Sequence, residues 1–253
     1  MSEKTIIVTG GSRGLGRATA RIAATMGVNV VLAARSEKAL QEVADEIGRT
    51  GGHALAVPGD LRKQKTCQHV VEEAVRRFGG VDGLVNNAGI LGPLAIIANA
   101  EPAAWTENWE INVLSPVMIT KFSLPHLRTS KGSIIHISTG MAVNPVAGTS
   151  AYNMAKAALN MFSATLAIEE PSITTIALRP GGVDTDVQAT LRAEGAAAMD
   201  PVVYKKYSTR ALLAPEIPGR AVATLVLYAP HDWSGRFISY DDEEVQALVE
   251  KYR

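Results

Sequence analysis

Short apolar runs rich in β-branched residues alternate with longer segments of helical periodicity along this 253-residue chain. The apolar runs are 5–10 (TIIVTG), 29–34 (NVVLAA), 54–59 (ALAVPG), 83–88 (GLVNNA), 133–138 (SIIHIS), 173–178 (ITTIAL) and 236–240 (RFISY), and the helical segments include 16–26, 36–50 and 65–79. Near-continuous apolar runs are typical of strands buried on both faces of a parallel sheet, and their alternation with helices is typical of βαβ units. The pattern predicts an α/β fold: a single domain over 1–253, with a doubly wound, mostly parallel seven-stranded sheet and ligand sites at the carboxyl ends of its strands.

Composition narrows the classes of function. Hydrophobic residues make up 47% of the chain, and Lys+Arg and Asp+Glu number 25 each, so the formal charge is zero. A neutral chain has no overall field that would draw it to nucleic acid or to an anionic membrane. The single cysteine, Cys67, allows no internal disulfide, and no apolar run reaches the roughly 18 residues of a membrane span. We therefore expect a cytoplasmic protein that acts on a small molecule, without nucleic-acid or membrane partners.

A glycine-rich stretch, TGGSRGLG, directly follows the first predicted strand and opens the first helix. Gly10, Gly14 and Gly16 allow a tight turn, a close approach to a pyrophosphate and close packing of the helix on the sheet. The free N–H groups at the start of that helix favour phosphate. A P-loop would need a Gly-Lys-Ser/Thr ending, which is missing, so the stretch predicts a dinucleotide site.

The end of the second predicted strand indicates which dinucleotide binds. An NAD site usually has an acidic residue here, whereas this chain reads Ala34, Arg35, Ser36. Arg35, with Arg13 of the glycine loop, supplies the cationic donors that a 2′-phosphate requires. The alternative is that both arginines are solvated surface residues; we interpret the pattern as NADP(H) binding.

Tyr152 and Lys156 are four residues apart in AYNMAK, a spacing that places both side chains on one face of a helix. Proton transfer by a tyrosine near neutral pH is difficult at its usual pKa of about 10, and a neighbouring ammonium would lower that pKa. An ordinary amphipathic helix could have the same spacing, so the pair needs support from other motifs.

That support comes from five motifs in order. TGGSRGLG, NNAG (86–89), Asn112 in WEINV, Tyr152-x-x-x-Lys156 and RPGGVDT (179–185) together resemble the short-chain dehydrogenase/reductase family over nearly the whole chain. The resemblance implies a Rossmann-type fold, oxidoreductase activity on CH–OH/C=O groups and a homo-oligomer, dimer or tetramer. Trp105, Trp109 and Met118 would lie on a long helix of the subunit interface, with buried core as the alternative.

The resemblance also implies a set of site residues. Tyr152 would be the acid/base, Lys156 would lower its pKa and hold the ribose, and Asn112 would support a proton relay. The implied cofactor-binding residues are Gly10, Ser12, Arg13, Gly14, Leu15, Arg35, Ser36, Asp60, Leu61, Asn87, Ala88, Gly89, Tyr152, Lys156, Pro180, Gly181, Val183 and Thr185. No metal-ligand spacing occurs among the five histidines, so no metal is expected.

The hydroxyl that orients the substrate carbonyl is expected thirteen residues before the tyrosine, where the family commonly has serine. That count reaches Thr139. Ser138 is the alternative, but period-two alternation at a strand end would turn it to the opposite face. We therefore predict that Thr139 takes this position.

The substrate wall is expected to follow the fifth and sixth strands. Its candidate residues are Met141, Val146, Gly182, Gln188, Leu191 and Met199, and residues 186–215 are expected to form a helical lid. VDTDVQ and WSGRFISYDDEEV resemble the sepiapterin reductase and benzil (diketone) reductase-like members of the family. Ser239 stands where the former have a pterin-binding aspartate, which disfavours a pterin.

The sequence thus predicts an NADPH-dependent carbonyl reductase acting on a small ketone or diketone. Two alternatives stay open: reduction of 3-oxoacyl thioesters by the same residues, and an NADP-binding sensor with little turnover.

Overall fold

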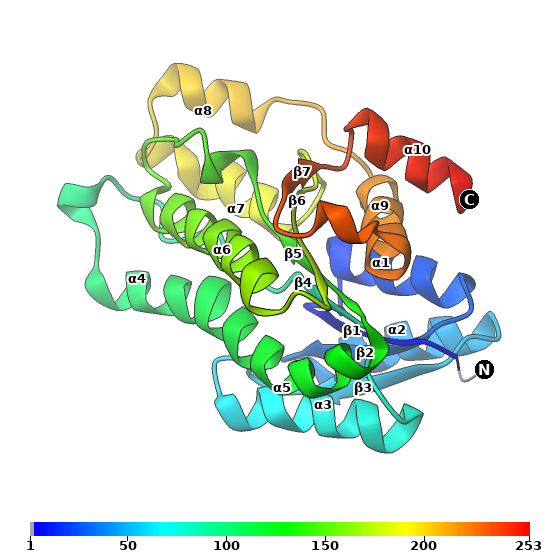
Figure 1. Ribbon diagram of the computed structural model, residues 1–253. Helices are drawn as coiled ribbons and strands as arrows, with labels where there is room; N and C mark the ends of the chain where they lie inside the picture. The colour runs from blue at the N-terminus through cyan, green and yellow to red at the C-terminus, as the bar shows by residue number, and fades with distance from the viewer. Residues whose placement is uncertain (1–2) are drawn as a thin grey trace.

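The computed structural model describes residues 3–253. Its seven strands form one sheet in the order β3-β2-β1-β4-β5-β6-β7 (Figure 1). The strands are β1 (Thr5–Thr9), β2 (Asn29–Ala34), β3 (Ala54–Pro58), β4 (Gly83–Asn86), β5 (Ser133–Ile137), β6 (Thr174–Arg179) and β7 (Phe237–Ser239). Every neighbouring pair is parallel, so the predicted doubly wound seven-stranded sheet is confirmed and is parallel throughout.

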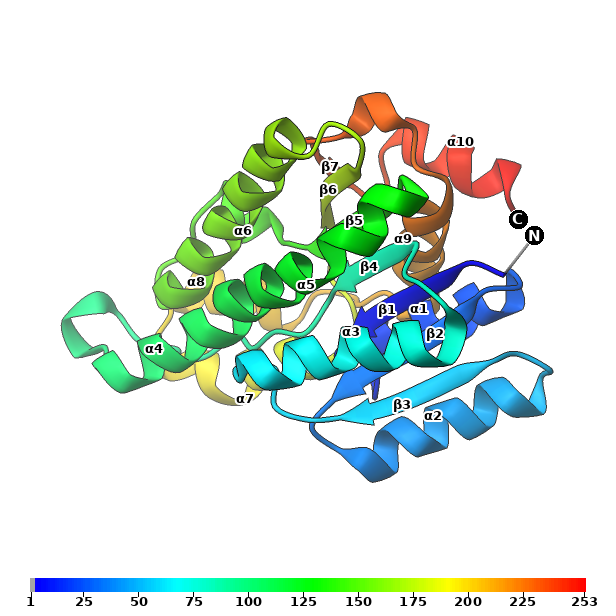
Figure 2. The same cartoon turned by 60° about the horizontal axis from the view of Figure 1, so that its bottom comes forward.

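Helices cover both faces of this sheet. One face is covered by α1 (Gly14–Thr25), α2 (Glu37–Arg49), α9 (Glu216–Tyr228) and α10 (Glu243–Lys251). The other is covered by α3 (Gln64–Phe78), α5 (Ser115–Ser130) and α6 (Ser150–Glu169). In Figure 2, α3 and α5 lie in front of the strands. The short helix α4 (Pro102–Trp109) precedes α5.

The central strands explain why the two layers form. Ile6, Ile7 and Val8 of β1 are fully buried, and their side chains alternate between the two faces. Ile6 and Val8 belong to the apolar cluster under α1 and α9, whereas Ile7 belongs to the cluster under α3 and α5. This is the period-two geometry of a strand that is covered on both sides.

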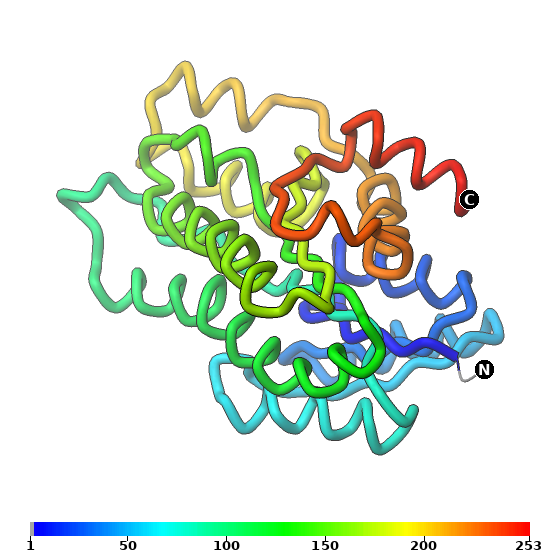
Figure 3. The backbone as a smooth tube through the Cα atoms, in the orientation of Figure 1, coloured from blue at the N-terminus to red at the C-terminus, as the bar shows by residue number. Residues whose placement is uncertain are grey.

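The predicted lid is mostly helical. It contains α7 (Asp186–Glu194), a short 3₁₀ helix (Gly195–Ala197) and α8 (Pro201–Ser208). Figure 3 shows this yellow segment running along the upper side of the molecule, away from α3. It packs onto a third, smaller apolar cluster that includes Met141, Tyr152 and Leu191. The lid therefore covers the side of the fold where the candidate catalytic residues lie.

Candidate active site

A cavity of about 1410 Å³ opens at the carboxyl ends of the strands, bordered by the loops after β1 to β6 and by α7. Sites for one small molecule usually measure roughly 300–1000 Å³, so this cavity has room for a dinucleotide and a substrate together. All the residues expected at the site line it except Asn112, Val146 and Met199. The predicted location, at the carboxyl edge of the sheet, agrees with this cavity.

The glycine loop has the geometry of a phosphate cradle. Gly10 and Gly14 have positive φ angles of 65° and 53°, which favour glycine. A Cβ at Gly16 would come within 2.3 Å of the Gly10 carbonyl oxygen, so only glycine lets α1 start this close to β1. No side chain caps the first turn of α1, and its free N–H groups fit a pyrophosphate.

Thr9, the last residue of β1, joins this loop to the NNAG segment. Its hydroxyl oxygen accepts hydrogen bonds from the backbone N–H of Asn87 (2.9 Å) and of Ala88 (3.1 Å). It also lies 3.1 Å from the Val85 carbonyl oxygen, to which it donates. The Asn87 side chain donates back to the Thr9 carbonyl oxygen at 2.9 Å. Thr9 was not among the expected site residues, although the loop motif contains it.

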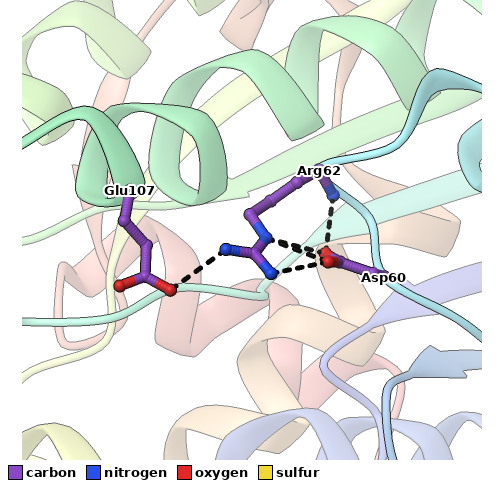
Figure 4. Close-up of polar contacts among 3 residues, drawn as sticks. All are labelled: Asp60, Arg62 and Glu107. Atoms are coloured by element: carbon purple, nitrogen blue, oxygen red, sulfur yellow. Dashed lines mark hydrogen bonds and ion pairs between the residues drawn. The ribbon is translucent and has the colours of Figure 1, made fainter. Parts of the chain in front are cut away.

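The end of the cavity that contains Asp60 holds a small ionic network, drawn in Figure 4. The guanidinium of Arg62 binds both carboxylate oxygens of Asp60, at 2.7 and 3.0 Å, and reaches Glu107 of α4 at 3.1 Å. The hydrogen bonds from Arg62 lower the pKa of Asp60, so this carboxylate stays charged. Sequence reasoning named Asp60 but missed Arg62, because its contact with Glu107 links residues 45 positions apart.

The two arginines expected at a 2′-phosphate have different surroundings. Arg13 pairs with Asp186 at the start of α7. Arg35 follows β2 directly, is exposed, and forms no ion pair among residues 3–253. Ser36 caps α2 through the Ala39 N–H, at 3.4 Å.

Tyr152 and Lys156 lie in the first two turns of α6 and are both buried. The Lys156 ammonium donates to the Ile137 carbonyl oxygen at 2.8 Å and lies 5.7 Å from the centre of the Tyr152 ring. Burial lowers the pKa of Lys156 to about 8 and raises that of Tyr152 to about 12. The expected lowering of the Tyr152 pKa is wrong for this state of the site, because desolvation of the phenolate dominates.

Asn112 lies just behind the cavity wall, in a π-helical turn (Glu110–Leu114) between α4 and α5. Its side chain donates to the carbonyl oxygens of Ile90 (2.9 Å) and Asn108 (3.1 Å). A Cβ at Gly89 would come within 2.6 Å of its Oδ1 and 3.4 Å of the Lys156 Nζ. Glycine at this position therefore lets the asparagine and the lysine converge, and the expected single long helix is interrupted at Asn112.

The two neighbouring hydroxyls at the end of β5 differ in their partners. The buried Ser138 Oγ donates to Asn160 Oδ1 at 2.5 Å. The half-buried Thr139 Oγ1 accepts from the Met141 N–H at 3.3 Å, which leaves its hydroxyl hydrogen free to donate. The geometry favours Thr139 as the donor toward a ligand in the cavity.

The expected substrate wall divides into two layers. Met141, Gly182, Gln188 and Leu191 line the cavity, whereas Val146 and Met199 pack behind them in the third apolar cluster. The sequence could not separate the layers, because the residues of the two layers are interleaved along the chain. Residues 3–253 contain no cluster of three potential metal ligands. Within the same range no helix is long and apolar enough to cross a membrane.

Comparisons with known proteins show which family model and which relatives the chain resembles. The family model for short chain dehydrogenase matches residues 4–196. Benzil reductase ((S)-benzoin forming) of Saccharomyces cerevisiae is 33% identical over 258 residues, which cover 96% of this chain and 97% of that protein. A short chain dehydrogenase/reductase structure from the same yeast superposes with a TM-score of 0.92 at 31% identity, covering 97% of this chain and 99% of the other. L-Sorbose reductase from Gluconobacter frateurii, solved with NADPH and L-sorbose, has a TM-score of 0.82 at 30% identity, covering 94% and 95%.

Proposed function

The chain belongs to the short-chain dehydrogenase family, and on that basis we propose that it is an NADPH-dependent carbonyl reductase that converts a small ketone or diketone to an alcohol. One observation carries the proposal. Tyr152, Lys156 and Thr139 border the same cavity as the glycine loop. A proton donor, a cation and a carbonyl-orienting hydroxyl thus stand where a nicotinamide and a ketone could meet.

When bound, NADPH supplies the hydride that adds to the carbonyl carbon. Tyr152 donates its phenolic proton to the carbonyl oxygen, which completes the alcohol. Its pKa of about 12 keeps this proton in place at neutral pH, as an acid requires. The Lys156 ammonium stabilises the phenolate left by the transfer, and the Thr139 hydroxyl donates to the carbonyl oxygen as negative charge develops there.

Two observations support NADPH rather than NADH. β2 ends without an acidic residue, and the exposed Arg35 that follows is available for the 2′-phosphate. The structural relative L-sorbose reductase was solved with NADPH. An apolar wall that includes Met141 and Leu191, together with similarity to a benzil reductase, supports a ketone or diketone with an apolar body.

The proposal is tested by following NADPH oxidation with benzil, aliphatic diketones, simple ketones and a 3-oxoacyl thioester. We expect turnover of the ketones, and Tyr152→Phe should lower kcat by about 100- to 10,000-fold, the range for losing a general acid. Tyr228→Phe, at a tyrosine outside the cavity, serves as the matched control. Turnover of the thioester alone would favour the thioester alternative, and tight NADPH binding without any turnover would favour a sensor.

A further inference from the structure

Arg210 reaches the cavity from the segment that follows α8. Its guanidinium lies next to Gly182, where an added Cβ would come within 2.8 Å of the arginine Cζ. The Tyr207 ring lies 5.2 Å away, in the range of a cation–π contact. Arg210 and Gly182 both line the cavity, on the side formed by the loop after β6.

The charge of Arg210 is not compensated. Its Nε is buried and has no hydrogen-bond partner, and residues 3–253 provide no ion pair for its guanidinium. Three other arginines of the cavity each pair with a carboxylate: Arg13 with Asp186, Arg62 with Asp60, and Arg179 with Asp241. Burial lowers the pKa of Arg210, and the nearby Arg192 acts in the same direction.

The segment also holds Arg210 in place. Arg192 of α7 donates to the backbone carbonyl oxygens of Ser208 (2.9 Å) and Arg210 (3.4 Å). Leu213 then pairs with the loop after β6, because its N–H donates to the Gly182 carbonyl oxygen at 2.7 Å. Burying part of a guanidinium without a hydrogen-bonded or ionic partner costs folding free energy, and a bound anion would offset that cost.

We propose that Arg210 binds a carboxylate carried by the ketone substrate, so that the enzyme prefers oxo acids with an apolar body over neutral ketones of the same shape. This inference rests on the proposed function. A guanidinium matches a carboxylate through two parallel hydrogen bonds. The apolar residues Met141 and Leu191 of the same cavity would contact the body of the substrate.

Two oxo acids test the proposal, phenylglyoxylate and 4-oxo-4-phenylbutanoate, each compared with its methyl ester. In the unaltered enzyme we expect kcat/KM to be higher for at least one acid than for its ester. Arg210→Gln should lower that acid-to-ester ratio by about 10- to 100-fold, the range for losing a charge-assisted hydrogen bond. Gly182→Ala, which places a methyl group against the guanidinium, should lower the ratio as well.

Lys205→Gln is the matched control, because it removes one positive charge from an exposed position on α8, just before this segment. Its acid-to-ester ratio should equal that of the unaltered enzyme. The proposal is overturned if neither acid exceeds its ester, or if Arg210→Gln leaves the ratio unchanged. It is also overturned if Arg210→Gln chiefly raises the KM for NADPH, since Arg210 would then serve the cofactor.

Calorimetric binding of the two acids, in the presence of NADP⁺, separates this inference from the proposed function. If the protein reduces no ketone, acid or ester at all, but the acids bind the unaltered protein and bind Arg210→Gln at least about tenfold more weakly, the anion site is supported and the reductase is refuted. Esters that are reduced as readily as acids would refute the anion site while supporting the reductase.

Discussion

Thr139 and Ser138 are adjacent in the chain, yet only one of their hydroxyls is free to serve a ligand. The Ser138 hydroxyl donates to Asn160, whereas the Thr139 hydroxyl only accepts, from the Met141 N–H, so its hydrogen is free to donate into the cavity. The extended backbone of Thr139, with φ −156°, turns the two side chains to different sides. The count from Tyr152 indicated Thr139 from the sequence, and the hydrogen bond of Ser138 supplies an independent argument.

Thr139→Ala is expected to lower kcat for ketone reduction by about 100- to 1000-fold, as for the loss of one donor to a developing oxyanion. Thr139→Ser should restore most of the rate, because it restores the donor. Ser138→Ala should have the smaller effect on kcat and should lower the free energy of unfolding by about 1 kcal/mol. Steady-state kinetics measures kcat, and chemical denaturation measures the free energy of unfolding. Full turnover by Thr139→Ala, with loss in Ser138→Ala, would reverse the assignment.

The lowered pKa of Lys156 predicts that the reaction rate depends on pH. Burial lowers its pKa from 10.5 to about 8, so the side chain is charged below this pH and neutral above it. The charged form stabilises the Tyr152 phenolate that forms during reduction. We therefore expect kcat/KM to fall as pH rises through about 8, well below the Tyr152 pKa of about 12.

A pH–rate profile of the unaltered enzyme and of Lys156→Met measures this effect. The variant should be slower and should lack the descending limb near pH 8. A profile of the unaltered enzyme that stays flat until the tyrosine itself titrates would contradict the assignment to Lys156.

At the level of elements, the long helix that the resemblance implied around Asn112 contains a π-helical turn. Trp105, Trp109 and Met118 were expected on one long helix, and the structure places a π-helical turn between α4 and α5. A π turn adds one residue to the hydrogen-bonded ring and is common at functional sites. Local periodicity does not reveal it, because the Asn112 side chain in this turn forms its hydrogen bonds with Ile90, which lies in the loop after β4.

The junction of β2 and α2 carries the cofactor prediction. Arg35→Gln is expected to raise the Kd for NADPH by about 10- to 100-fold while changing the Kd for NADH much less, because only NADPH has the 2′-phosphate. Fluorescence titration of both cofactors measures this. Arg49→Gln, an exposed arginine at the far end of α2, is the control. Equal losses for NADPH and NADH would contradict the role of Arg35.

At the scale of the whole molecule, large apolar side chains are exposed on α4, on α6 and in the π-helical turn between α4 and α5. Trp109 of α4 is 41% exposed, Leu114 43%, and Met154 and Met161 of α6 53% and 68%. Trp109 and Met154 border the same shallow pocket, beside Trp105. Large exposed apolar groups gathered on one side are typical of an interface. They favour the interface interpretation of Trp105 and Trp109 over buried core.

We accordingly predict a homo-oligomer, dimer or tetramer, that associates through α4 and α6. Met154→Asp combined with Met161→Asp should shift the protein toward the monomer, because a charge in an apolar interface is costly to desolvate. Val202→Asp, on α8 and 77% exposed, is the control. Analytical ultracentrifugation measures the mass. A monomeric unaltered protein, or an oligomer unaffected by the double change, would contradict this interface.

The sequence by itself determined the doubly wound sheet. It also indicated Tyr152, Lys156 and the glycine loop as candidate site residues. Strands buried on both faces need continuous apolar runs, and a spacing of four residues already places two side chains on one helical face. Such features depend only on residues that are close in the chain. They can therefore be predicted from the sequence without the tertiary structure.

Only the tertiary structure decided which groups are desolvated and which charges are paired. Arg210 meets Gly182 and Arg62 meets Glu107 across long sequence separations, and no local pattern marks either contact. The Tyr152 pKa rises rather than falls because folding removes the ring from water. Burial and charge pairing depend on segments that meet only on folding, so they follow from the assembled molecule and not from any local stretch of its sequence.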